Sequence, residues 1–97
     1  MLITFESTTA AFRAKKYIED FLPHLDETAA IVPLPFELSN TCYGNGLAVK
    51  ASDSDAKILA KGLKEDRIGV KHFWSPNKYG LYEVIDEQVG FTGGRDK

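Results

Sequence analysis

The chain has 97 residues, of which 43% are hydrophobic and 27% charged, and its formal net charge is -2. A chain of this length forms one small domain with a thin core, and the composition is typical of a globular protein rather than a disordered or membrane-spanning one. The slightly acidic balance gives no long-range attraction for nucleic-acid phosphates or anionic lipid, so neither is an expected partner.

The first quarter of the chain predicts a strand followed by a helix. Leu2–Phe5 is a short apolar run, and hydroxyl side chains suited to capping a helix follow it at Ser7–Thr9. From Ala10, apolar residues recur every three or four positions, which indicates a helix with one face to bury. Pro23 is expected to end this helix, since proline disfavours the helical conformation of the residue before it. The predicted buried stripe contains Ala10, Ala11, Ala14, Ile18, Phe21 and Leu22.

The middle of the chain predicts a hairpin. The apolar segment 29–35 is short enough for a strand, but Pro33 and Pro35 cannot donate ladder hydrogen bonds, which confines it to a sheet edge. A turn-rich segment, 40–46, separates it from a second predicted strand, 47–51.

A second helix and a second hairpin follow. Ser52–Asp55 has the spacing of a capping box and opens a helix, whose expected inward stripe is Ala56, Leu59, Ala60 and Leu63. Segments 70–74 and 81–85 read as strands joined by the loop 75–80. Residues 86–97 hold few apolar side chains and three glycines, which predicts a flexible C-terminal tail after a single domain over 1–85.

The order of these elements predicts an α+β fold of the ferredoxin-like split βαββαβ type, with room for an extra C-terminal strand. In this topology strand 47–51 lies beside the first strand, the proline-bearing strand lies at an edge, and both helices cover one face. The first hairpin turn and the start of the first helix then lie at the same end of the sheet.

That turn contains Cys42, the one cysteine of the chain. A helix start carries partial positive charge and unpaired amides, so a thiol beside it would ionise more readily than a free thiol, whose pKa is about 8.5. The interpretation competes with a simpler one, in which a single cysteine is an inert small hydrophobe. The residues expected near the sulfur are Ser7, Thr8, Asn40, Thr41, Gly44 and Gly46.

Two segments carry a resemblance to a known family. Leu2-Ile-Thr-Phe-Glu-Ser-Thr8, with Pro33-Leu-Pro-Phe-Glu-Leu-Ser-Asn-Thr-Cys42, resembles the putative selenium/sulfur carrier protein-like family of small bacterial domains, over residues 2–70. The resemblance implies that Cys42 is the carrier atom, which accepts sulfur or selenium as a persulfide or selenosulfide. It also implies donor and acceptor proteins as partners, and a carrier rather than a stand-alone enzyme.

Other candidate sites are weaker. His24 and His72 match no local metal-ligand spacing with Cys42, and acidic residues 53 and 55 are explained by helix capping. We therefore expect no metal or other cofactor. The rival hypothesis is a small-ligand-binding or regulatory module in which Cys42 has no role and the aromatic segment 73–82 forms the interface of a homodimer.

The sequence also gives expectations about location. A single cysteine forms no internal disulfide, and the strand beginning at Leu2 leaves no room for a signal peptide. No apolar run approaches the roughly 18 residues that cross a bilayer. We therefore expect a cytoplasmic protein.

Overall fold

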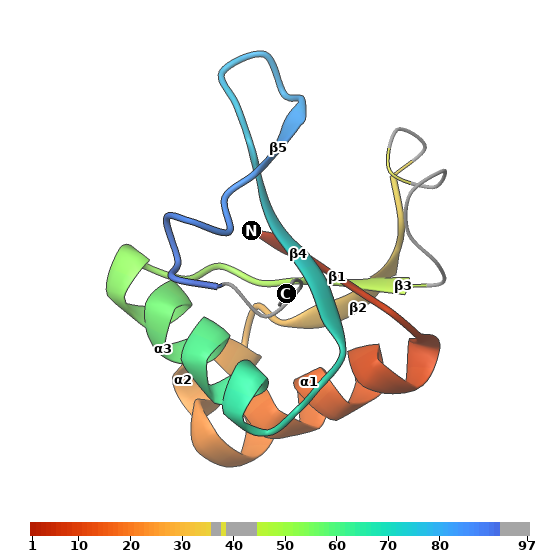
Figure 1. Cartoon of the computed structure of the whole chain (residues 1–97), viewed down its shortest axis with the longest axis vertical. Coiled ribbons are helices and arrows are strands. Elements are labelled where there is room, and N and C mark those ends of the chain that lie inside the picture. The colour runs from red at the N-terminus through yellow and green to blue at the C-terminus, as the bar shows by residue number, and fades with distance from the viewer. Residues whose placement is uncertain (36–37, 39–44, 92–97) are drawn as a thin grey trace.

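The computed structural model describes residues 1–35, 38 and 45–91 (Figure 1). The elements, in chain order, are β1 (Leu2–Phe5), α1 (Thr8–Phe21), α2 (Pro23–Asp26), β2 (Ala30–Pro33), β3 (Asn45–Ala48), α3 (Asp53–Glu65), β4 (Val70–Pro76) and β5 (Tyr82–Val84). The described residues thus form a mixed α+β structure with a five-stranded antiparallel sheet and three helices.

The strand order in the sheet is β2-β3-β1-β4-β5, and each neighbouring pair is antiparallel. The predicted edge position of the proline-bearing strand is confirmed, as is the position of β3 beside β1. In the centre of the sheet, Ile3 lies opposite Leu47 on one side and Phe73 on the other. The second predicted hairpin is confirmed by the pairing of β4 with β5.

The two long helices begin in the same way. Ser7 and Ser52 both have extended backbone, and each serine Oγ accepts a hydrogen bond, at 3.1 Å, from the amide three residues later. This is the geometry of an N-cap, which satisfies one of the four amides that a helix start leaves without an intrahelical partner. The sequence predicted Ser52 as the start of a capping box, and it offered Ser7 as one of three hydroxyl residues suited to cap α1.

The short helix α2 was not predicted. Pro23 ends α1 as expected but also occupies the first position of α2, where its missing N–H costs nothing. Lys15 connects the two helices, with Nζ 2.7 Å from Asp26 Oδ1 and 3.0 Å from Glu19 Oε2. These hydrogen bonds, first that to Asp26 and then that to Glu19, raise the pKa of Lys15 above its ordinary value.

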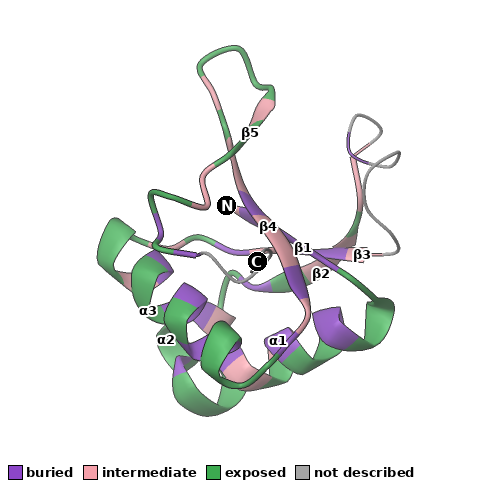
Figure 2. Ribbon diagram, in the orientation of Figure 1, coloured by how far each residue is buried: buried purple, intermediate pink, exposed green. Residues whose placement is uncertain are grey.

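The helices all lie on one side of the sheet, and the core fills the space between them (Figure 1). Buried positions on the helices face the strands, whereas the outward faces are exposed (Figure 2). The largest side chains with almost no exposed surface are Phe5, Phe73, Ile3, Ile18, Leu47, Leu59, Leu63 and Thr4. Both predicted inward stripes contribute, except that Phe21 is 65% exposed and Leu22 takes the buried position instead. Both residues suit the helical spacing from Ile18, so periodicity alone did not separate them.

The opposite face of the sheet is closed over β1. Leu2 and Thr4 alternate with the core-facing residues of β1, yet they are 2% and 0% exposed. The indole Nε1 of Trp74 donates a hydrogen bond to Thr4 Oγ1 at 3.0 Å, which satisfies the buried hydroxyl and fixes the indole against the strand.

The segment after β5 packs on the core, although the sequence predicted a flexible tail from Asp86 onward. Val89 and Phe91 are each 5% exposed, and the Phe91 ring lies edge-on to Phe73 with centroids 5.1 Å apart. Asp86 fixes the segment, because its carboxylate accepts hydrogen bonds from the Phe73 amide at 2.7 Å and from His72 Nδ1 at 2.8 Å. Residues 92–97 of the predicted tail lie outside the described residues.

The strand boundaries differ modestly from those predicted. The strand expected over 29–35 spans Ala30–Pro33, and that expected over 47–51 is shifted to Asn45–Ala48. The predicted turn 40–46 therefore gives its last two residues to β3. No helix in the described part of the chain is long and apolar enough to cross a membrane.

Candidate functional site

The start of α1 lies at the end of the sheet from which the β2–β3 connection leaves. Ile3 pairs with Leu47, and Leu2 with Ala48, so β3 runs antiparallel to β1 and Asn45 is at the same end as Phe5. Asn45 in turn pairs with Pro33, the last residue of β2. The predicted meeting of the helix start and the first hairpin connection at one end of the sheet is therefore confirmed for the strand ends that the structure describes.

The start of α1 suits a negative charge. Its first turn contains no acidic residue, and Thr8 and Thr9 are exposed. Ser7 satisfies the Ala10 amide, but the amides of Thr8 and Thr9 have no partner within the helix. A helix start of this kind carries about half a positive charge and stabilises a nearby anion by roughly 0.3–1 kcal/mol when exposed.

Glu6 is the acidic group that precedes this helix. Its backbone amide donates to the Gly69 carbonyl at 2.8 Å, and its carboxylate lies against Gly69, where an added Cβ would be 3.0 Å from Oε1. The side chain thus lies along the connection that enters β4.

Of the residues predicted to surround the sulfur, the structure describes three. Ser7 is the N-cap and Thr8 the first residue of α1. Gly46 lies inside β3 and is buried, not in the turn where the sequence placed it. An added Cβ there would be 3.0 Å from Leu2 Cδ1, 3.1 Å from Leu34 Cδ2 and 3.2 Å from the Ile3 carbonyl oxygen. Gly46 is therefore required for close packing of β3.

The remaining predicted site residues, Asn40, Thr41, Cys42 and Gly44, lie outside the described residues.

The two histidines are each paired with an aspartate in a different part of the fold. His24 Nε2 is 3.2 Å from Asp55 Oδ1 and connects α2 to the start of α3. His72 pairs with Asp86 at the other end of the chain. Among the described residues, no group of three or more histidine, cysteine or acidic side chains is arranged to hold a metal ion.

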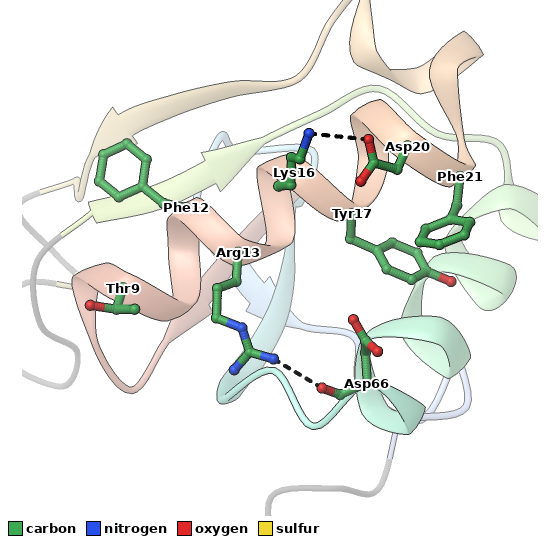
Figure 3. A pocket seen from close by; sticks show the side chains of 8 residues that line it. All are labelled: Thr9, Phe12, Arg13, Lys16, Tyr17, Asp20, Phe21 and Asp66. Atoms are coloured by element: carbon green, nitrogen blue, oxygen red, sulfur yellow. Dashed lines mark hydrogen bonds and ion pairs between the residues drawn. The ribbon is translucent and has the colours of Figure 1, made fainter.

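A hollow that the sequence did not predict lies between α1 and the end of α3 (Figure 3). Its volume is about 350 Å³, and it is lined by Thr9, Phe12, Arg13, Lys16, Tyr17, Asp20, Phe21 and Asp66. Arg13 Nη2 donates to the Asp66 carbonyl at 3.2 Å, and Lys16 Nζ is 3.4 Å from Asp20 Oδ1. Tyr17 and Phe21 lie side by side, with ring centroids 4.8 Å apart. The exposed phenylalanines of α1 were a signal for this surface, but its far wall comes from a distant part of the chain.

A comparison with known protein families gave a match. The family model described as "Putative Se/S carrier protein-like" matches residues 1–75. The chain belongs to this family. The match covers β1 to most of β4 and includes Cys42, whereas β5 and the segment that packs after it lie outside it. No curated protein and no solved structure matched the chain in the corresponding searches.

Proposed function

We propose that the protein is a sulfur or selenium carrier in which the Cys42 thiolate holds the transferred atom. The observation that carries the proposal is membership of the Se/S carrier family over a stretch that includes Cys42. Cys42 also lies only three residues before Asn45, which is at the same end of the sheet as the start of α1. The strand order, with β5 added beside β4, further supports a ferredoxin-like fold.

The chemistry asks for a nucleophilic and accessible sulfur. The Cys42 thiolate attacks the outer sulfur of a donor persulfide, an S–S bond forms to Cys42, and the donor's own S–S bond breaks to release the donor as a thiolate. The exchange involves no net oxidation. An acceptor thiolate then attacks the outer atom and Cys42 leaves as a thiolate. The same steps with selenium as the outer atom give a selenosulfide.

The start of α1 would stabilise negative charge on the carrier both before and after loading. Unpaired amides and the positive end of the helix favour the thiolate over the thiol before loading, and favour the anionic terminal atom after it. No general base is required, since the nucleophile is already ionised. Ser7 and Thr8 are therefore positioning residues in this proposal.

Loading of the full chain with a small-molecule persulfide donor tests the function. We expect intact mass spectrometry to detect one added sulfur atom, reductant to remove it, and the Cys42→Ser variant to gain none. If the folded wild-type protein gains no sulfur under conditions that load a reference low-pKa thiol protein, the carrier function is refuted.

The hollow beside α1 supports a second candidate function, a small-ligand-binding module that does not use Cys42. Aromatic side chains with charged groups at the rim of a concave surface are typical of small-molecule sites. If this second function is correct, the Cys42→Ser variant replaces the wild-type protein fully in cells. Under the carrier proposal, the same variant remains folded but does not replace the wild-type protein at all.

A further inference from the structure

The two edges of the sheet are protected very differently. At one edge, β2 ends with Pro33, which has no amide to offer, and Pro35 follows. At the other edge, β5 consists of Tyr82, Glu83 and Val84, with no proline. Natural sheets protect edge strands with prolines and charges, because an open edge pairs with other strands. β5 has one charged residue and is otherwise open.

The backbone of β5 presents hydrogen-bonding groups away from the sheet. The Leu81 carbonyl accepts from the Asn77 amide at 2.8 Å, and the Ile85 amide donates to the Phe73 carbonyl at 2.8 Å. Residues 81 and 85 therefore direct their backbone groups toward β4, as does Glu83 between them, which lies opposite Ser75. The intervening residues, Tyr82 and Val84, direct their N–H and C=O groups outward.

The hairpin that contains β5 also exposes large apolar side chains. Tyr79, Leu81 and Val84 are 75%, 58% and 47% exposed. The β4–β5 hairpin projects beyond the body of the molecule, away from the helices (Figure 1). A second strand can therefore approach β5 without meeting α1, α2 or α3.

We propose that β5 pairs antiparallel with β5 of a second copy of this chain, around a two-fold axis at Glu83. In this register the two residues whose backbone groups face outward pair across the axis: Tyr82 lies opposite the partner's Val84, and Val84 lies opposite the partner's Tyr82. The segment is self-complementary, which is what a two-fold interface between identical chains requires. Four backbone hydrogen bonds close the pair, two for each Tyr82–Val84 contact.

Neighbouring registers fit less well. A shift toward the turn would bring the backbone of Gly80, which has φ of +81°, into the ladder. A shift the other way would use the backbone of Asp86, whose carbonyl already accepts a hydrogen bond from the Phe91 amide at 2.8 Å. The three-residue strand thus favours the register centred on Glu83.

This register also places the two Glu83 side chains opposite each other. Each carboxylate accepts a hydrogen bond from Asn77 Nδ2 of its own chain at 2.9 Å, which draws it toward the hairpin turn. Like charges on directly opposite strands oppose pairing. The dimer is therefore weak at low ionic strength and tighter in added salt.

Sedimentation velocity of the full chain over a concentration series tests the pairing. We expect a reversible monomer–dimer equilibrium in the wild type. Val84→Glu, which adds a charge to the open edge, weakens it by at least about tenfold, because two charged side chains then face the apolar contacts. Ile58→Glu is the matched control, since Ile58 is 54% exposed on α3 and far from the hairpin in sequence. We expect it to dimerise like the wild type. Circular dichroism verifies that both variants are folded.

The Glu83→Gln variant tests the register. The glutamine oxygen still accepts from Asn77, but the facing charges are gone, so dimerisation tightens by about two- to fivefold. A wild type that stays monomeric up to millimolar concentration overturns the proposal. So does a folded Val84→Glu variant that dimerises like the wild type. Weaker dimerisation of Glu83→Gln also overturns it, and would point to a partner strand with a basic residue at this position.

Discussion

The two long helices begin with the same cap but differ in charge. Ser7 and Ser52 bond the amide three residues later at the same distance, 3.1 Å. The first turn of α3 contains Asp53 and Asp55, whereas the first turn of α1 contains no acidic residue. Asp55 is also engaged by His24. The positive end of α3 is therefore neutralised by its own first turn, whereas among the described residues the first turn of α1 offers no acidic side chain that does the same.

This difference separates a structural helix start from a candidate functional one. The start of α1 is at the end of the sheet where the connection containing Cys42 leaves β2 and enters β3. In the carrier proposal, the missing charge in α1 is supplied by the thiolate of Cys42.

Removing the caps is expected to have the largest effect on stability. Ser7→Ala and Ser52→Ala should each lower the free energy of unfolding by about 1 kcal/mol, because each leaves an amide without its acceptor. Urea unfolding followed by circular dichroism measures both. If one of the two losses lies in the usual range of about 0.5–2 kcal/mol and the other lies outside it, the two serines are not equivalent as caps.

Exchanging the charges should change stability less, and in opposite directions. Asp53→Asn should destabilise the protein by about 0.3–1 kcal/mol, since acidic groups favour a helix start. Thr9→Glu should stabilise it by a similar amount when it is made in the Cys42→Ser background, where no thiolate competes for the start of α1. Thr9→Gln is the control for side-chain size. Both effects should shrink in high salt. If Thr9→Glu is no more stable than Thr9→Gln, the start of α1 is already neutralised by another group.

The sequence predicted the parts of the fold that depend on local signals. The helix starts were predicted from the capping residues, and the buried stripe from the spacing of alanines on α1. The edge strand was predicted from the prolines of β2. Each of these acts within a few residues of itself, so a single sequence contains the necessary information.

Features that depend on distant residues were missed. The burial of Val89 and Phe91 depends on Phe73 and Asp86, and no sequence pattern connects these two pairs of residues. The helix α2 was missed for another reason, because it is too short to show a helical period. The hollow forms only where α1 meets the end of α3. For the site, the sequence identified the helix start and the strands that lie beside it. The role of Gly46 in packing was not recognised, because its close neighbours come from β1 and from Leu34.

The pH dependence of Cys42 alkylation shows whether the folded protein lowers the pKa of this thiol. Rates measured for the folded wild type, the folded Thr9→Glu variant and the wild type unfolded in urea give the thiol pKa in each state. We expect a pKa well below about 8.5 in the folded wild type, a higher pKa in Thr9→Glu, and an ordinary value in the unfolded chain. Equal pKa values in the folded and unfolded wild-type protein would contradict it.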